Sequence, residues 1–508
     1  MGDDKKTQLT PAFEDFEPMF KPGAMIPVFA ELAADFETPL SAFQKISGGE
    51  QAFLLESAEK TEQAGRYSFL GCSARMTFEA RGRAVTVREG EAVRTFDAEG
   101  GDPLVELERV MADFQPTGGS GLPVFHGGAV GYLGYDGVRY FEPTVGEAPA
   151  DELGLPEMFF MVTDAVVIFD HRFRLMQVVA NVFADDFPDP QAAYTAARAR
   201  IDGLIRKLEV PLHTKPMRTR MADAGDSGDV RSNTTKEEYM GMVEAAKEYI
   251  HAGDIFQVVP SQRFETDFEG TPLDLYRALR HVNPSPYMFV LTCPGGFSLV
   301  GSSPEVHVRC IDKKVEIRPI AGTRWRGETE EEDMALGEEL LADPKERAEH
   351  IMLVDLARND VGRVADYASV EVDDLMIIER YSHVMHIVSN VSGQLKDGST
   401  SYDVMRATFP AGTVSGSPKV RAMQIINELE KSKRCAYAGA VGYFGFDGNH
   451  DSCIALRTCV VKDRTVYVQA GAGVVADSVP EYEYNETVNK ARGMLRAVER
   501  ARMLSKGE

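Results

Sequence analysis

The stretch GAVGYLGYDG spans residues 128–137, and GAVGYFGFDG spans residues 439–448. Eight of the ten positions are identical, although about three hundred residues separate the two copies. Glycine lets a neighbouring chain segment approach closely, and Asp-Gly is a typical hairpin-turn dipeptide. The repeat therefore predicts two Gly-rich strands, each ending in a tight turn, that serve as framework in both halves of the chain.

The segments that flank the two copies differ. The first copy continues into VRYFEPT, which holds no cluster of reactive side chains, whereas the second follows Tyr437 and precedes the apolar segment CIALRTCVV with Arg457 in it. We expect this segment, 453–461, to be one mostly buried strand, in which an arginine needs an anionic partner. The partner can be a structural carboxylate or a bound ligand, and both alternatives stay open.

The composition is that of an ordinary globular protein, with 508 residues and 44% hydrophobic content. The longest apolar stretch, MFFMVTDAVVIF, is too short for a membrane span and contains Asp164, and the N-terminal segment lacks an apolar signal, so we expect a cytoplasmic protein. The six cysteines form no CxxC pair, which predicts reduced thiols. A formal net charge of −24 disfavours nucleic acid and membranes as partners, and an anionic substrate needs local arginine, backbone amides or a metal ion.

The chain divides at a polar segment. Residues 211–235 are rich in Pro, Gly, Ser and Asp and predict a linker or long surface loop. The segment before it is sheet-rich, with a hairpin of long strands at 160–169 and 174–183. After it we expect a helix that starts with a capping box at Thr235 and Glu238 and ends at Gly253, then a strand at 255–265 and helices near 334–341, 344–360, 418–431 and 480–505. Hairpins outnumber strand–helix–strand units, which favours an α+β fold with antiparallel sheets.

Two pairs of glutamates lie three positions apart, Glu346 with Glu349 and Glu483 with Glu486. On a helix this spacing puts both members of a pair on one face. Two such helix starts that face each other would offer up to four carboxylates to a hard divalent cation, and Mg2+ is the natural candidate.

Simpler explanations compete with these sites. Asp343 can cap a helix that starts at Pro344, which would make Glu346 the third helical residue in a capping box, and Glu486 can form a surface ion pair with Lys490. Similarly, the GAG sequence at 471–473 can bind a carboxylate through its backbone amides or can be an ordinary turn.

Two histidines, His383 and His386, lie three positions apart in RYSHVMHIVSNVSG. In a strand, side chains at this spacing point to opposite faces. A histidine in a strand can be structural or catalytic, and the spacing alone does not decide between the two.

Several long motifs carry a resemblance to a known family. They are LVGSSPEVHVR, IRPIAGTRWRG, AEHIMLVDLARNDVGRV, RYSHVMHIVSNVSG, TFPAGTVSGSPKVRAM, GAVGYFGFDG and VQAGAGVVADSVPEYEYNETVNKA. In this order they resemble the chorismate-utilising enzymes, specifically the large subunit of anthranilate synthase. The resemblance is most specific from about 235 to 505, and FLLESAE and the first GAVGY copy extend it towards the N-terminus.

The resemblance implies a fold and a division of labour. The fold is α+β, with antiparallel sheets packed as a β-sandwich and helices outside. Residues 1–210 are expected to form an N-terminal domain that contributes a regulatory site for tryptophan, and residues 236–508 are expected to form the chorismate-binding catalytic domain.

The resemblance also assigns roles to single residues. Glu349 and Glu486 match direct Mg2+ ligands, and Glu346 and Glu483 match outer-shell acids. Glu305 matches an acid that protonates the leaving hydroxyl, and His386 matches the residue tied to proton removal. The substrate-binding positions are Gly322, Thr323, Tyr437, Arg457, Gly471, Ala472 and Gly473. The tryptophan-binding positions are Ser57, Pro286, Tyr287 and Met288.

The implied reaction joins chorismate and ammonia to give anthranilate and pyruvate, with feedback inhibition by tryptophan. No cysteine lies in a Gly-rich nucleophile elbow, so we expect a separate glutamine amidotransferase subunit to deliver the ammonia, in a hetero-oligomer. Isochorismate and salicylate synthases have lysine where this chain has Gln257. Aminodeoxychorismate synthase, the nearest alternative, typically has lysine at Ala321. A non-catalytic tryptophan sensor on the same fold is the other alternative.

Overall fold

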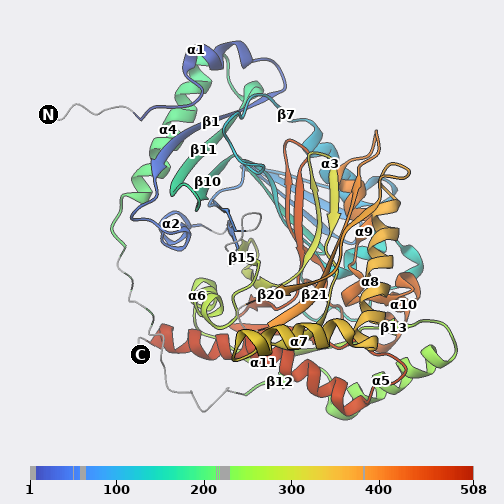
Figure 1. Cartoon of the computed structure of the whole chain (residues 1–508). Coiled ribbons are helices and arrows are strands. Elements are labelled where there is room, and N and C mark those ends of the chain that lie inside the picture. Colours follow the sequence, from blue (N-terminus) through green and yellow to red (C-terminus); the bar gives the residue numbers. More distant parts are fainter. Residues whose placement is uncertain are drawn as a thin grey trace.

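The computed structural model describes residues 7–49, 51–57, 65–212, 214, 217, 229–381 and 384–506. Most of the predicted linker at 211–235, and also His383, therefore lie outside the described residues. The described chain forms two large sheets, which we name sheet A and sheet B, with helices on their outer faces (Figure 1).

Sheet A runs from edge to edge through β12 (Arg231–Ser232), β14 (Ser261–Asp267), β26 (Thr465–Gly471), β25 (Thr458–Lys462), β16 (Phe297–Ser303), β15 (Tyr287–Cys293), β2 (Ala52–Glu56), β3 (Tyr67–Gly71), β10 (Ala165–Asp170), β11 (Leu175–Phe183), β1 (Ala24–Ala33) and β7 (Gln115–Pro116).

Sheet B runs through β19 (Ile320–Trp325), β21 (Val384–Gln394), β18 (Lys314–Ile317), β17 (Val306–Ile311), β24 (His450–Ile454), β23 (Ala440–Gly445), β8 (Gly128–Leu133), β9 (Met158–Thr163), β4 (Met76–Arg81), β5 (Ala84–Glu89) and β6 (Ala92–Asp97). Two further pairings are β20 (Glu371–Arg380) with β21, and β13 (Gln257–Val258) with β22 (Gly416–Ser417).

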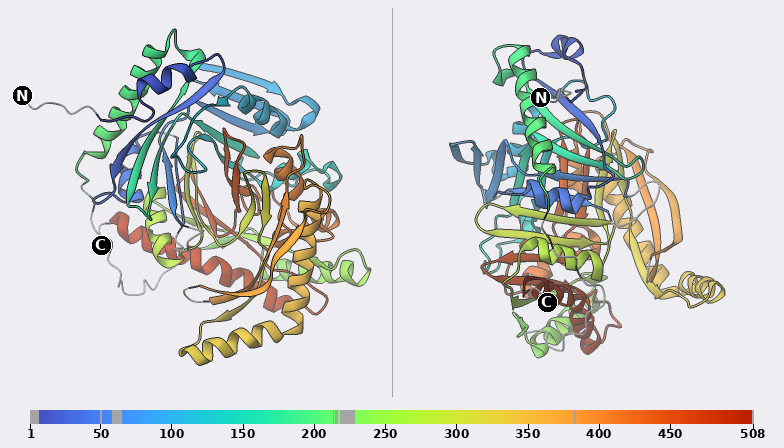
Figure 2. Two further views of the ribbon diagram at one scale, coloured as in Figure 1. Left: turned by 45° about the horizontal axis from the view of Figure 1, so that its top comes forward. Right: turned by 90° about the vertical axis from the view of Figure 1, so that its left-hand side faces the viewer.

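The helices are α1 (Phe13–Phe16), α2 (Pro39–Ile46), α3 (Pro103–Ala112), α4 (Pro190–Leu208), α5 (Lys236–His251), α6 (Pro272–Val282), α7 (Glu330–Ala342), α8 (Pro344–Gly362), α9 (Ser401–Thr408), α10 (Lys419–Leu429) and α11 (Pro480–Lys506). None of the helices in the described ranges is long and apolar enough to cross a membrane. Figure 2 shows α7 projecting from the body of the molecule beside the hairpin of β20 and β21.

The sheets pack face to face as a sandwich. Phe53 and Phe289 of sheet A and Tyr132 and Phe159 of sheet B are at most 2% exposed in the core between the sheets. The outer face of sheet A packs on α2, α4, α6 and α11, and sheet B packs on α3, α5, α9 and α10. In the described part of the chain, strand pairs are antiparallel except for β1 with β7. The predicted α+β sandwich with outer helices is confirmed.

The two halves of the chain are built alike. Read from the middle outwards, sheet A has β2, β3, β10, β11, β1 and β7 on one side and β15, β16, β25, β26, β14 and β12 on the other. Sheet B repeats this arrangement around the pair of β8 and β23. The order of strands therefore has an approximate two-fold symmetry, and each sheet contains strands of both halves.

The repeated decapeptide lies at the centre of this symmetry. Its two copies form β8 and β23, which pair antiparallel with Gly131 opposite Gly442. A Cβ atom on Gly131 would lie 1.9 Å from the carbonyl oxygen of Phe159, and one on Gly442 would lie 2.1 Å from that of Asp451. Glycine is required at both positions because the neighbouring backbone occupies the space of a side chain.

The ends of the two copies differ. Asp447-Gly448 forms the predicted hairpin turn between β23 and β24, with Gly448 at φ +85°. The predicted turn at Asp136-Gly137 is wrong, since these residues lie in a short 3-10 helix, Tyr135–Tyr140. The carboxylate of Asp136 accepts a hydrogen bond from the distant Cys435 N–H, so a tertiary contact replaces the local turn.

Three predicted strands are wrong in extent. The segment 255–265 forms two strands because Pro260, which cannot donate a backbone hydrogen bond, interrupts it. The segments 160–169 and 453–461 each divide between the sheets, at Asp164 and at Arg457 respectively. The predicted helices are confirmed: α5 begins with its capping box at Thr235, and the other four lie at the expected places.

Candidate functional site

The C-terminal half passes from one sheet to the other at two places that lie side by side, one between β16 and β17 and one between β24 and β25. We call these places crossings. Glu305 directly precedes β17, and Arg457 directly precedes β25. The backbone N–H of Ile454 donates to the carbonyl of Glu305 at 3.0 Å, and the N–H of Ser302 donates to the carbonyl of Arg457 at 3.1 Å. Arg457 has φ +46°, a left-handed conformation that is uncommon for arginine and that often marks a functional position.

The side chains at the crossings are a carboxyl and a guanidinium, and neither has an ion-pair partner in the part of the chain that the structure describes. Burial raises the pKa of Glu305 to about 8, against the lowering effects of the Thr413 hydroxyl and of the charges on Arg457 and Lys490. Burial also lowers the pKa of Arg457, although solvent still reaches its side chain. Among the described residues Arg457 has a single long hydrogen bond, 3.5 Å to the Asn283 side chain. The site thus combines a proton donor with an open receptor for an anion.

His386 lies on β21, facing a bulge in β19. Its Nδ1 is 2.8 Å from the carbonyl oxygen of Gly322 and 3.1 Å from the hydroxyl of Thr323. Burial lowers the pKa of His386; the Gly322 hydrogen bond opposes the shift and the charge of Arg457 adds to it. A neutral imidazole that donates from Nδ1 to Gly322 has a lone pair on Nε2, so this histidine can accept a proton.

The two acidic helix starts are close enough to influence each other. Burial raises the pKa of Glu349 on α8, with smaller contributions from the charges of Glu346 and of Glu486 on α11. Burial raises the pKa of Glu483 as well, and the neighbouring Glu486 adds to the shift. The Gln257 side chain donates to Glu349 at 3.3 Å. Repulsion between these carboxylates favours a cation among them.

Cations of the protein already lie beside these acids. Lys490 pairs with Glu486 at 2.7 Å, as in the simpler sequence interpretation, and Arg324 lies 3.5 Å from Glu346. The other simple interpretation holds in part, since Asp343 caps α8, whereas the Glu346 side chain lies beside Arg324. In the described ranges no group of three or more His, Cys, Asp and Glu side chains is arranged to hold a metal ion. The oxygen-rich donor set fits Mg2+ in its chemistry.

The glycine turn at 471–473 lies between Tyr437 and Gln257. A Cβ atom on Gly471 would lie 2.8 Å from the Tyr437 hydroxyl, and one on Gly473 would lie 2.7 Å from Nε2 of Gln257. The amide of Ala472 donates to the carbonyl of Pro260 at 3.2 Å, so it is engaged within the protein. Burial raises the pKa of Tyr437 to about 12, and its hydroxyl therefore stays protonated as a hydrogen-bond donor.

The positions matched to tryptophan binding meet at the centre of sheet A. Ser57 directly follows β2, and Pro286 directly precedes β15, with Met288 opposite Glu56. Met288 is 1% exposed in the core behind the sheet, whereas the hydroxyl of Tyr287 donates to Asp451 at 3.0 Å. Adjacent strand residues point to opposite faces, so one face of the sheet receives only one of these two side chains.

Sequence reasoning missed Thr413 as a member of this group. Its Oγ1 is buried and has no hydrogen-bond partner among the described residues, and it lies near Glu305, whose pKa it lowers. The only signal in the sequence is its place in the motif TFPAGTVSGSPKVRAM. Gln257 was noted for another reason, and its contact with Glu349 follows only from the three-dimensional arrangement.

Comparisons with known proteins agree with this picture. The model of a family described as chorismate binding enzyme matches residues 50–496. A Pseudomonas putida protein named anthranilate synthase component 1 is 49% identical over 482 residues, which are 94% of this chain and 96% of that protein. An Aquifex aeolicus protein of the same name is 49% identical over 476 residues, 94% and 95% of the two chains.

Solved structures show the same likeness. The crystal structure of anthranilate synthase component I from Streptococcus pneumoniae aligns with a TM-score of 0.76 at 35% identity and covers 91% of this chain and 99% of that one. The menaquinone-specific isochorismate synthase of Escherichia coli aligns with a TM-score of 0.68 at 19% identity, over 96% and 99% of the two chains, and shares the fold.

Proposed function

The chain belongs to the chorismate-binding enzymes, and from this membership together with the site we propose that it converts chorismate and ammonia to anthranilate and pyruvate. The observation that carries the proposal is the pair of crossings, where a carboxyl with a pKa of about 8 lies beside an arginine that has no ion-pair partner among the described residues. Such a pair suits a substrate that is anionic and has a hydroxyl to lose. Relatives of nearly equal length named anthranilate synthase component 1 support the same reaction.

The proposed chemistry uses two residues for proton transfer. Ammonia forms a bond to the ring as the bond to the ring hydroxyl breaks. Glu305 gives its proton so that the hydroxyl leaves as water, and the new ammonium group loses a proton. His386 then uses its Nε2 to remove a ring proton while the enolpyruvyl C–O bond breaks. The ring becomes aromatic, and the released enolpyruvate takes up a proton to give pyruvate. General acid–base steps of this kind typically contribute about 10² to 10⁴ in rate.

In this proposal the substrate is held at its carboxylates. Arg457, Tyr437 and the turn at Gly471, Ala472 and Gly473 bind one carboxylate, and Gly322 with Thr323 makes another contact. The closeness of the turn to Tyr437 supports this grouping. Because the Ala472 amide already donates to Pro260, the tyrosine hydroxyl and Arg457 are expected to dominate.

Mg2+ is the proposed cofactor. Glu349 and Glu486 would hold it directly, with Glu346 and Glu483 in the outer shell. The ion would neutralise the second carboxylate of the substrate and the negative charge that develops during elimination. The mutual influence of acids on α8 and α11 supports this assignment.

The remaining parts of the proposal concern partners and control. A glutamine amidotransferase subunit supplies ammonia in a cytoplasmic hetero-oligomer, and residues 236–508 act as the catalytic domain. Residues 1–210 contribute Ser57 to a tryptophan site completed by Pro286, Tyr287 and Met288, at the junction of β2 and β15 in sheet A.

One assay tests the function. Purified protein is mixed with chorismate, ammonium and Mg2+, and anthranilate fluorescence is followed with and without tryptophan. Turnover that tryptophan inhibits is the expected result. A non-fluorescent amino adduct would instead indicate aminodeoxychorismate synthase, and tryptophan binding without turnover would indicate a sensor.

A pair of variants tests the metal assignment. Glu349→Gln should abolish Mg2+-dependent turnover while the protein stays folded. The matched control is Glu481→Gln on α11, because Glu481 pairs with Lys236 at 2.6 Å rather than with the acidic group. Full activity of the Glu349 variant would remove the assignment.

A further inference from the structure

The loop that carries Tyr437 has a strained backbone. Cys435 has φ +54° and Ala438 has φ +63°, although neither is glycine. A left-handed conformation at such residues is energetically unfavourable and persists only where surrounding contacts enforce it. The position of Tyr437 therefore depends on whatever holds this loop.

Residues of the first copy of the repeat form the hydrogen bonds that keep this loop in place. The carboxylate of Asp136 accepts a hydrogen bond from the N–H of Cys435 at 2.8 Å, and the N–H of Tyr135 donates to the carbonyl of Cys435 at 2.9 Å. Both peptide groups of the strained residue are thus bound by two neighbouring residues of the other half. A Cβ atom on Gly134 would lie 2.7 Å from the Cys435 oxygen, so glycine is needed there for this approach.

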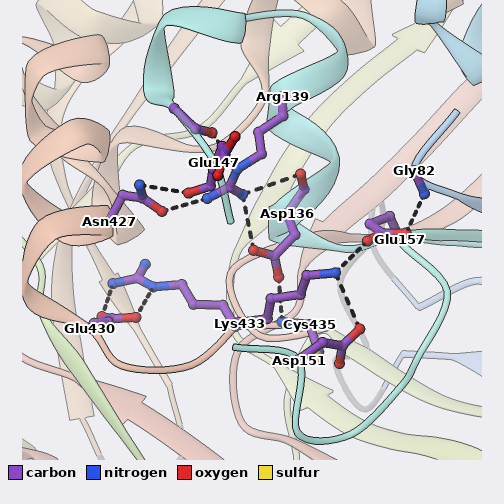
Figure 3. Close-up of polar contacts among 12 residues, drawn as sticks. Gly82, Asp136, Arg139, Glu147, Asp151, Glu157, Asn427, Glu430, Lys433 and Cys435 are labelled. Atoms are coloured by element: carbon purple, nitrogen blue, oxygen red, sulfur yellow. Dashed lines mark hydrogen bonds and ion pairs between the residues drawn. The ribbon is translucent and has the colours of Figure 1, made fainter. Parts of the chain in front are cut away.

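Further contacts fix Asp136 itself (Figure 3). Its side chain is buried, and Arg139 donates to it at 3.0 Å. The same guanidinium donates to the Asn427 side chain at 2.6 Å, which ties this segment to α10. Asp136 therefore has a single orientation, with one oxygen towards Arg139 and the other towards Cys435.

Two neighbouring residues of the loop also contact the N-terminal half. Lys433 pairs with Glu157 at 2.8 Å and with Asp151 at 3.2 Å, as Figure 3 shows. The guanidinium of Arg434 lies 4.6 Å from the centre of the Tyr135 ring and 5.5 Å from that of the Tyr437 ring. The N-terminal half thus also contacts the two residues that precede Cys435 and reaches Tyr437 through Arg434.

We propose that Asp136 is a positioning residue for substrate binding, which acts through Cys435 to place the hydroxyl of Tyr437 against the substrate carboxylate. The proposal rests on the function proposed above. It also gives the two copies of the repeat different tasks: the second leads away from Tyr437, and the first holds the loop in which Tyr437 lies. In this proposal the N-terminal half shapes the site for the substrate carboxylate without itself contacting the substrate there.

The test compares two substitutions with a matched control. Asp136→Ala removes the acceptor and should raise KM for chorismate about tenfold or more, with a smaller change in kcat. Asp136→Asn keeps one oxygen for the Cys435 N–H but loses the acceptor for Arg139, so KM should rise by no more than about threefold. The control is Asp447→Ala, at the same place in the second copy, where the carboxylate accepts from the Asn449 N–H at 3.0 Å in a hairpin turn. It should lower Tm and leave KM unchanged.

A double variant separates positioning from general damage. If Asp136 acts through the tyrosine, Asp136→Ala adds little to the KM of Tyr437→Phe. Multiplying effects, or a KM in Asp136→Ala no higher than in Asp447→Ala, would overturn the proposal. If the alanine variant does not fold, Asp136→Ser takes its place, since its shorter side chain fills the site without reaching Cys435. Absence of anthranilate formation by the parent protein would refute the proposed function instead.

Discussion

The two halves of the molecule cross between the sheets at equivalent places, and the crossings carry opposite charges. In the N-terminal half Arg75 directly precedes β4 and Asp164 directly precedes β10. In the C-terminal half the corresponding residues are Glu305 before β17 and Arg457 before β25. The acid and the base have exchanged places between two copies of one backbone arrangement.

What differs most is how these charges are satisfied. Arg75 pairs with Glu89 at 3.0 Å and with Asp186, and Asp164 pairs with Arg200 at 2.5 Å, although burial still raises the pKa of Asp164. Among the described residues neither Glu305 nor Arg457 has an ion pair. The protein therefore pairs the charges at one copy of the crossing and leaves them unpaired at the other, which agrees with the proposed substrate site.

The largest expected effect comes from the framework that both halves share. Gly131→Ala and Gly442→Ala should each prevent folding, with a loss above roughly 4 kcal/mol, because the new Cβ would overlap a backbone oxygen. Gly448→Ala, at φ +85° in open space, should cost only about 1–2 kcal/mol. Circular dichroism and thermal unfolding measure both. A Gly442 variant that unfolds at the parent's Tm would show that the centre of symmetry is not tightly packed.

The second-largest expected effect is on kcat, and it distinguishes the crossing at Glu305 from the equivalent crossing at Arg75. Glu305→Gln should lower kcat about 10²- to 10⁴-fold, since glutamine cannot donate the proton. In the parent, activity should fall as pH rises through about 8, where the carboxyl loses that proton. Arg75→Gln, at the equivalent place, should leave kcat unchanged. Comparable loss of kcat in both variants would mean that the crossings act only on structure.

The helix starts and the crossings show which features of the fold can be predicted from the sequence. The capped starts of α5 and α8 follow from residues two or three positions apart, and such local contacts are visible in a sequence. The sheet changes at Asp164 and Arg457 are not, because an apolar run of strand length looks the same whether it stays in one sheet or passes to the other. The neighbouring strands determine which sheet such a segment joins, and those strands are distant in sequence.

The site was predicted unevenly for the same reason. Spacing alone suggested the pairs around Glu349 and Glu486, because helical periodicity brings their members together. Glu305 and His386 came from the resemblance, since nothing in their local sequence sets them apart. The contact of Asp136 with Cys435 joins residues 299 positions apart, and the local Asp-Gly signal predicted a turn instead.

A further difference concerns acid stability. His307 on β17 and His450 on β24 are buried and share the Ser452 hydroxyl at 3.1 and 2.9 Å, whereas the second residue of β4, equivalent to His307, is Thr77. Burial lowers the pKa of each histidine to about 3. An unfolded histidine takes up a proton below about pH 6.5, so this stability is complete above that pH and declines as the pH falls towards 3.

Each histidine should therefore cost about 2 kcal/mol of stability at pH 5. Hydrogen exchange at pH 5 and pH 7 measures this, and β17 and β24 should lose protection at the lower pH before β4 and β9 do. His307→Asn should make the loss less steep. Equal loss in both halves, or an unchanged pH dependence in the variant, would contradict the assignment.

The smallest effect distinguishes the crossings by the sign of a stability change. The folded protein holds Glu305 with a pKa of about 8, above the ordinary 4.5, so the stability that its proton supplies is complete below pH 4.5 and is lost as the pH rises to 8. Glu305→Gln never has to ionise, and its advantage over the parent in free energy of unfolding should grow between pH 5 and 8 and reach ~1 kcal/mol or more. Arg75→Gln should instead lose roughly 1–2 kcal/mol, because Arg75 pairs with two acids and lies over the Phe183 ring. Thermal unfolding at pH 6 and pH 9 measures both variants. A Glu305 variant that is less stable than the parent at pH 9 would show that the ionised carboxyl stabilises the fold, as Arg75 does, and would contradict its role in binding a substrate.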